Sequence, residues 1–174
     1  MCLFQPPNIA LNSVTTPSAT TRRKRTPCVG ICSTTYGDLV CRGCKRFAHE
    51  IVQWNGYESD QKEMIWQRLN SIRDEVALQW LRVEDPARYA EFLAHASLDP
   101  SAPEGEQLYE CLRQLVVASK SLAAAGLICA STAQASEAQA DLLGGEALKV
   151  MRQVDAEIYA RSVAHYEHCF RIPV

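Results

Sequence analysis

Four cysteines lie within a span of seventeen residues, and their spacing is the clearest sign of a chemical site in the sequence. Cys28, Cys32, Cys41 and Cys44 form the pattern C-x3-C-x8-C-x2-C. Zinc takes four tetrahedral ligands in structural sites, and its bonds to thiolate sulfur are about 2.3 Å long. Two short cysteine pairs joined by a tight turn can converge on one ion. The pattern therefore predicts a metal site with these four thiolates as ligands.

The identity of the metal is a choice between zinc and an iron–sulfur cluster, because both accept four cysteines. The common cluster-binding runs C-x2-C-x2-C-x3-C and C-x4-C-x2-C are absent from the sequence. Two pairs that enclose a turn are more typical of a closed structural zinc site. We expect zinc, with an iron–sulfur cluster as the alternative. A closed four-ligand site leaves no position for a substrate, so we expect no catalysis at the metal.

The neighbours of the second cysteine pair could also take part in the site. His49 is the nearest other candidate ligand. On a helix that continues from Cys44, it would lie about 140° around the axis from that cysteine, which favours a surface or supporting role. Arg42, Lys45 and Arg46 can offset the negative charge of a four-thiolate site, and the alternative interpretation is that they are solvated surface residues.

Other functional signals in the chain are weak. The sequence contains no phosphate-binding glycine loop, no G-x-S-x-G and no H-E-x-x-H. We therefore assign no catalytic residue and expect that the protein is not an enzyme. A basic run of Arg22, Arg23, Lys24 and Arg25 could contact nucleic-acid phosphates. The formal net charge of the whole chain is −2, however, so the favoured interpretation of this run is a solubilising flank.

Composition indicates one globular protein with a tail. The chain has 174 residues and is 47% hydrophobic, which is enough for a core. Residues 1–26 are predicted to be a disordered basic tail, 27–83 a four-cysteine metal-binding module with two helices, and 84–174 a helical C-terminal region. We found no apolar stretch long enough to cross a membrane and no secretory signal, so we expect a cytoplasmic protein with reduced cysteines.

The predicted fold class is mainly α. Turn residues around Gly37, flanked by apolar residues, predict a short hairpin between the two cysteine pairs. Apolar residues at helical spacing predict a helix from Cys44 to Trp54 and a second from about Asp60 to about Arg82. The Asp85-Pro86 pair predicts the start of a short third helix. After a linker at 99–105, two longer helices are expected at 108–122 and 147–166, and they should pack as an antiparallel pair. A weaker helix is expected between them, at 133–143.

Several short motifs together resemble the bacterial domain of unknown function 1289. They are Thr26-Pro27-Cys28-Val29-Gly30-Ile31-Cys32, Cys41-Arg42-Gly43-Cys44-Lys45-Arg46, Glu50-Ile51-Val52 and Trp54-Asn55-Gly56-Tyr57. The resemblance covers about residues 26 to 83 and implies a four-cysteine site in a soluble bacterial protein. Members of this family are commonly labelled predicted iron–sulfur proteins, and the resemblance implies no reaction.

These observations lead to three functional hypotheses. The first is a non-enzymatic protein with a structural zinc site that serves as a platform for an unidentified protein partner. The second is an iron–sulfur protein for electron transfer or redox sensing. The third is a nucleic-acid-binding regulator that uses the basic tail. None of them requires a membrane.

Overall fold

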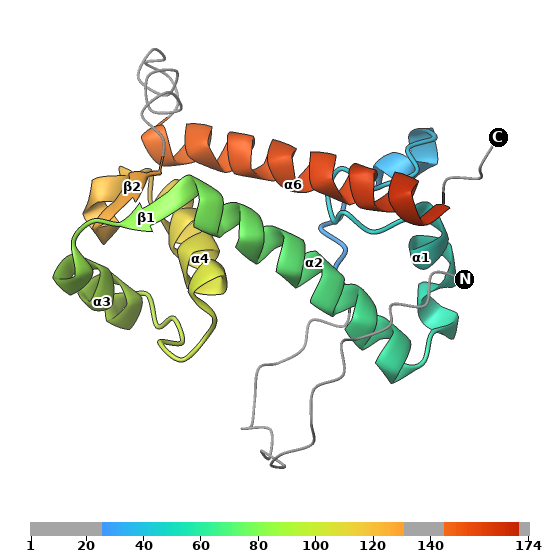
Figure 1. The fold of residues 1–174 in the computed structure, drawn as a ribbon, viewed down its shortest axis with the longest axis horizontal. Helices are drawn as coiled ribbons and strands as arrows, with labels where there is room; N and C mark the ends of the chain where they lie inside the picture. The colour runs from blue at the N-terminus through green and yellow to red at the C-terminus, as the bar shows by residue number, and fades with distance from the viewer. Residues whose placement is uncertain (1–25, 131–144, 171–174) are drawn as a thin grey trace.

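The structure is a computed structural model that describes residues 26–130 and 145–170 (Figure 1). It is mainly helical, as predicted. The helices are α1 (Ala48–Gln53), α2 (Ser59–Trp80), α3 (Pro86–His95), α4 (Glu104–Val117) and α6 (Glu146–Phe170), with 3-10 turns η1 (Ser33–Tyr36), η2 (Trp54–Gly56) and η3 (Leu122–Ala125). Two predictions lie outside the described residues. One is the weak helix at 133–143, and the other is the tail with its basic run, of which only the last residue is described.

The main core forms where the C-terminal half of α2 meets α3, α4 and the first half of α6. The predicted leucine stripe of α4 is completely buried there, at Leu108, Leu112 and Leu115. Val154 and Ile158 of α6 pack into the same cluster. Burial of each such side chain stabilises the fold by about 1.5–3 kcal/mol before the entropy of ordering is subtracted. Within the described residues, no helix is both long and apolar enough to cross a membrane.

A two-stranded sheet closes one end of this core and was not predicted. Strand β1 (Leu81–Val83) follows α2 directly, and it pairs antiparallel with β2 (Leu127–Cys129). The prediction that the second helix reaches about Arg82 is therefore wrong at its end. The backbone at Leu81 turns extended, with φ −122° and ψ 145°, and Arg82 lies opposite Ile128 in the ladder. The partner strand lies far along the chain, so local periodicity could not reveal the change.

Helix α4 begins within the predicted linker, and Gly105 in its first turn allows a close approach to α2. A Cβ atom at this position would lie 2.6 Å from both the Cβ and the carbonyl oxygen of Asp74. We expect Gly105→Ala to lower the free energy of unfolding by about 1–3 kcal/mol, because the two helix backbones must separate. Chemical denaturation would measure this change.

Gly56→Ala is a suitable control, because a Cβ at Gly56 would meet nothing within 4 Å. Its free energy of unfolding should stay close to that of the unchanged protein. An equal loss of stability in the two variants would contradict the steric explanation.

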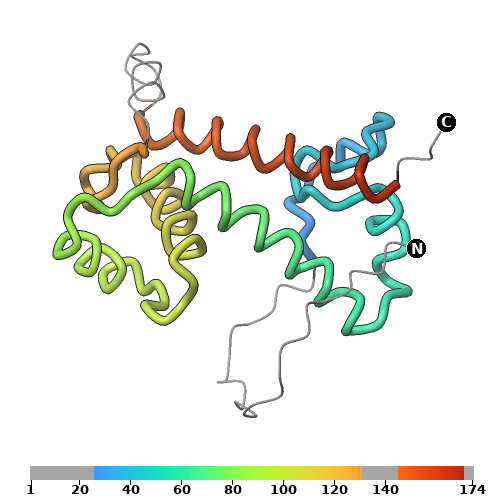
Figure 2. The backbone as a smooth tube through the Cα atoms, viewed as in Figure 1, coloured from blue at the N-terminus to red at the C-terminus, as the bar shows by residue number. Residues whose placement is uncertain are grey.

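Helices α2 and α6 lie close together near the sheet and diverge toward the opposite end of the molecule (Figure 2). Residues 26–56, which we call the cysteine module, lie at that diverging end (Figure 1). The buried residues of the module are separate from the main core cluster. The protein therefore has a main core and a second, smaller buried region that is built on the cysteine module. The buried hydrophobic residues of this second region are Val40, Cys41, Phe47, Trp54 and Ile65.

Candidate metal centre

The first cysteine pair lies on an irregular loop that is organised by hydrogen bonds to sulfur. The backbone N–H of Gly30 donates to Cys28 Sγ at 3.4 Å, and Gly30 has φ 100°, which favours glycine. Cys32 Sγ lies 2.9 Å from the hydroxyl oxygen of Thr34. The loop then forms η1 and ends at Gly37 with φ 97°. Both sulfur atoms therefore have a polar hydrogen-bonding neighbour from their own loop.

The predicted hairpin between the two pairs is wrong. The bridge that does form in this region pairs Val40 with Phe47, across the second cysteine pair instead. Turn residues around Gly37 close a 3-10 turn, and the apolar residues Ile31 and Leu39, expected on paired strands, are 77% and 59% exposed. The turn chemistry was recognised, but the strands that it would join are absent from this part of the chain.

The second cysteine pair forms a tight knuckle. The N–H of Cys41 donates to the carbonyl of Arg46 and the N–H of Lys45 donates to the carbonyl of Cys41, both at 2.9 Å. Lys45 has φ 60°, in the left-handed region that a non-glycine residue seldom adopts. The chain thereby folds back on itself around the sulfur atoms of Cys41 and Cys44.

Helix α1 starts at Ala48, so the prediction of a helix running from Cys44 is wrong in its first turn. The rotation between Cys44 and His49 therefore cannot be measured around one helix axis. The ring of His49 packs against Phe170, with centroids 5.1 Å apart. The structure thus places His49 in an aromatic contact with α6.

The two cysteine loops lie directly against each other. A Cβ on Gly43 would approach the Val29 side chain to 2.7 Å and the carbonyl oxygen of Ile31 to 3.0 Å. The N–H of Arg42 donates to the Ser33 hydroxyl at 2.9 Å. A side chain at position 43 would force its neighbours to shift, so the glycine in Cys41-Arg42-Gly43-Cys44 suits a knuckle packed on a second loop.

Cys41 is completely buried, and several N–H groups point at its sulfur atom. Burial disfavours its thiolate, but backbone N–H donors from Cys44, Ser33 and Gly43 outweigh that effect and lower the pKa of Cys41 to about 7. Cys44 differs, because burial raises the pKa of its thiol despite hydrogen bonds from Arg46. One thiol of this pair is therefore already prepared to act as a metal ligand near neutral pH.

Arg46 is the most informative neighbour of the knuckle. It is only 3% exposed, its Nε donates to Cys44 Sγ at 3.3 Å, and its guanidinium lies 4.8 Å from the centroid of the Trp54 ring. Among residues 26–130 and 145–170, no carboxylate forms an ion pair with Arg46. Burying a guanidinium without a negative partner is costly, and Cys44 would supply that partner once its thiol is ionised. This geometry favours the charge-offsetting interpretation of Arg46 over solvated surface.

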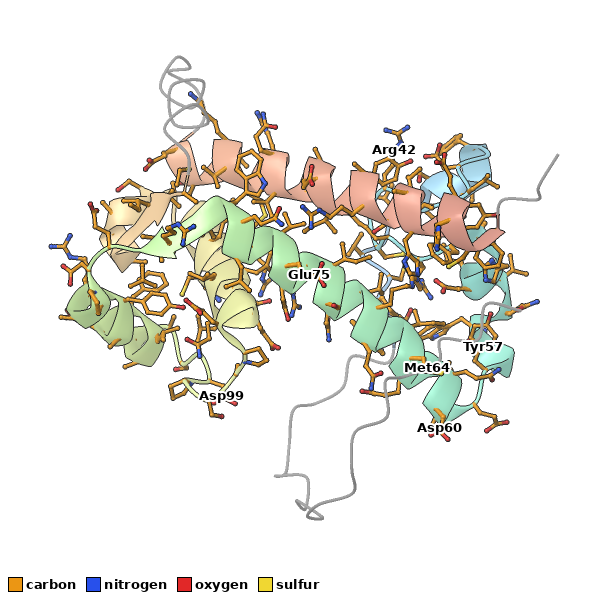
Figure 3. All side chains as sticks on the ribbon, in the orientation of Figure 1. Arg42, Tyr57, Asp60, Met64, Glu75 and Asp99 are labelled. Carbon is orange, nitrogen blue, oxygen red and sulfur yellow. The ribbon has the colours of Figure 1, made fainter. Side chains whose placement is uncertain are left out.

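Lys45 is also buried, and it connects the knuckle to α6. Its Nζ donates to the carbonyl of Arg42 at 2.7 Å and forms an ion pair with Asp155. Arg42 itself is exposed, as Figure 3 shows beside α6, and its guanidinium lies 5.1 Å from the centroid of the Tyr159 ring. The basic residues after Cys41 therefore have three different roles in the structure.

Sequence reasoning missed a buried ion pair beneath the module. Arg68 of α2 donates to both carboxylate oxygens of Glu50, at 2.9 and 2.6 Å, and its guanidinium lies 3.8 Å from the centroid of the Phe47 ring. Glu50 also accepts the backbone N–H of Phe47 at 2.9 Å. The motif Glu50-Ile51-Val52 contained one member of this pair, but its partner comes from another helix.

The donor set fits a thiolate-bound metal in chemistry, and the structure brings the two loops together. Each of the four sulfur atoms has a hydrogen-bonding neighbour, as sulfur ligands commonly do. The described residues nevertheless contain no group of three or more His, Cys, Asp or Glu side chains arranged to hold an ion. Cys41 and Cys44 interact with each other, and the loop that carries Cys28 and Cys32 packs beside them.

Fold and site together define a mainly helical protein that carries a cysteine knuckle module at one end. Residues 26–73 match the family described as "Protein of unknown function (DUF1289)". The matched segment contains all four cysteines together with Glu50 and Arg68, and the predicted resemblance is confirmed over it. The matched segment covers less than a third of the chain. No curated protein and no solved structure matches this sequence.

Proposed function

We propose that this protein is a non-enzymatic metal-binding protein in which Cys28, Cys32, Cys41 and Cys44 hold a structural zinc ion. The observation that carries the proposal is the burial of Arg46 against Cys44. Burying an uncompensated cation is costly, and the Cys44 sulfur, 3.3 Å from Arg46 Nε, would compensate it as a thiolate. Coordination to a metal would keep that sulfur ionised, because metal ligation deprotonates a thiol.

The backbone around Cys41 supports the same proposal. Three N–H groups directed at one buried sulfur lower the pKa of Cys41, so little proton affinity opposes metal binding there. When bound, zinc supplies a positive centre that holds the two loops together. The residues of the chain orient the sulfurs, exclude water from Cys41 and balance the remaining negative charge through Arg46.

We propose that the module makes contacts with a protein partner. Val29, Ile31, Tyr36 and Leu39 are large apolar side chains of the two cysteine loops, and all are more than half exposed. A small metal module that buried these residues against another protein would act as a structural platform. A reducing cytoplasm is the proposed compartment, because it would keep the cysteines available as ligands.

Elemental analysis of protein purified without oxygen tests the metal. We expect a colourless protein with about one zinc ion per chain, since a closed site takes four ligands around one ion. A brown protein that contains iron and sulfide would replace zinc with the iron–sulfur alternative. A reduced protein that takes up neither metal would remove the proposal altogether.

A further inference from the structure

The C-terminal part of α6 lies outside the main core. The residues of α6 that belong to the core cluster end at Ile158, although the helix continues to Phe170. The remaining twelve residues, 159–170, lie outside this hydrophobic cluster, although Ser162 among them is completely buried. We call this stretch the α6 end.

The cysteine module supplies most of the described side-chain contacts of the α6 end. The ring of Phe47 lies 5.0 Å from that of Tyr166 and 5.8 Å from that of Phe170, between centroids, and both contacts are edge-on. Aromatic pairs of this geometry add about 0.5–1.5 kcal/mol to their apolar burial. The Arg42 guanidinium packs over the Tyr159 ring at the start of the same stretch.

Lys45 fixes the helix just before this stretch. Its side chain is 8% exposed, and its ammonium group links two knuckle carbonyls to Asp155 of α6. Lys45 makes these contacts from a left-handed backbone conformation within the knuckle, with φ 60°. The knuckle carbonyls of Arg42 and Gly43 thereby hold the ammonium group beside Asp155.

The α6 end also contacts α2 directly. Arg161 contacts Gln79 and lies 3.9 Å from the carboxylate of Glu75, and the Glu75 side chain is 60% exposed. Exposed ion pairs contribute about 0–1 kcal/mol. Most of the side-chain contacts that the structure gives to the α6 end therefore involve the cysteine module.

We propose that the metal state of the cysteine module controls the docking of the α6 end. With the ion bound, the knuckle holds Lys45 and Phe47 in place and the α6 end packs on the module. Without the ion, the knuckle loosens and residues 159–170 detach, while the main core keeps 147–158 in place. This inference rests on the proposed metal function, and it adds a conformational output to that function.

Hydrogen exchange on the full chain, with and without zinc, tests this proposal, with zinc content measured on the same samples. We expect amide exchange in 159–170 to become about tenfold faster or more when zinc is removed, and exchange in 147–158 to change little. Bound zinc with unchanged exchange in 159–170 would overturn the inference and leave the metal function standing. An equal change in both segments would also overturn it, because it would indicate general stabilisation. Failure to bind zinc would remove both proposals.

A variant outside the four cysteines separates docking from metal binding. Asp155→Asn should keep the zinc content and accelerate exchange in 159–170, because Lys45 loses its charged partner. Glu167→Gln removes a carboxylate from an exposed position of the same helix and should leave the exchange pattern unchanged. The inference fails if Asp155→Asn retains zinc and exchanges like Glu167→Gln.

Discussion

Replacing Cys41 and Cys44 together by serine should abolish zinc binding and unfold the cysteine module. The two sulfurs lie at the centre of the knuckle, and Cys41 is completely buried. Structural zinc contributes an apparent binding free energy on the order of 10 kcal/mol, and a module of this size cannot replace that from its own small core. Zinc content and near-ultraviolet circular dichroism would record the two losses, because Trp54 is buried within the module.

Cys129→Ser is the matched control for this double variant. Cys129 is a partly buried cysteine at the end of β2, far from the knuckle in the chain. It should keep its zinc and its circular dichroism spectrum. The double variant is compared with this control both with chelator and with zinc. If the Cys41 and Cys44 double variant stays as folded as the control under both conditions, the ion is not part of the fold.

Glu50→Gln should lower the free energy of unfolding by about 3–5 kcal/mol, because it leaves Arg68 as a buried and unpaired cation. The side chains of Glu50 and Arg68 are 8% and 14% exposed. Burial lowers the pKa of the Arg68 guanidinium, and Glu50 opposes that shift. Nη1 of Arg68 already lacks a hydrogen-bond partner in the described part of the chain, so few groups could replace the carboxylate. Denaturant unfolding of the zinc-loaded protein would measure the loss.

Two further variants make this result specific to the buried charge. Adding Arg68→Met to Glu50→Gln should recover part of the stability, since the lone cation is then removed. Glu110→Gln removes the carboxylate of a Glu–Arg pair with a 2.9 Å contact at a more exposed position, and should cost less than about 1 kcal/mol. Equal effects of Glu50→Gln and Glu110→Gln would show that burial does not amplify the pair.

Features that depend on neighbouring residues could be predicted from the sequence. Asp85 caps α3 by accepting the N–H of Arg88 at 3.0 Å, and Pro86 begins the helix, as the dipeptide indicated. The long apolar stripe correctly predicted α6, which the structure extends to Phe170. Helical periodicity and capping are local, so a single sequence carries both signals.

Features that join distant segments could not be predicted in this way. The partner of β1 lies more than forty residues further along, and the partner of Glu50 is Arg68 on a different helix. The pairing of two loops around the cysteines was expected, but the hairpin between them was not found. A turn signal around Gly37 fixes only the reversal of the chain, and strand pairing needs partners that the loop does not supply.

The position of Phe47 between two helices has a thermodynamic consequence. Its ring contacts Arg68 on α2 and Tyr166 on α6, so it would couple the binding of an ion in the cysteine module to the docking of α6. Coupling between two binding events is reciprocal. If the ion tightens α6, then any molecule that pulls α6 away must weaken the hold on the ion by the same factor, so a binding partner could trigger metal release.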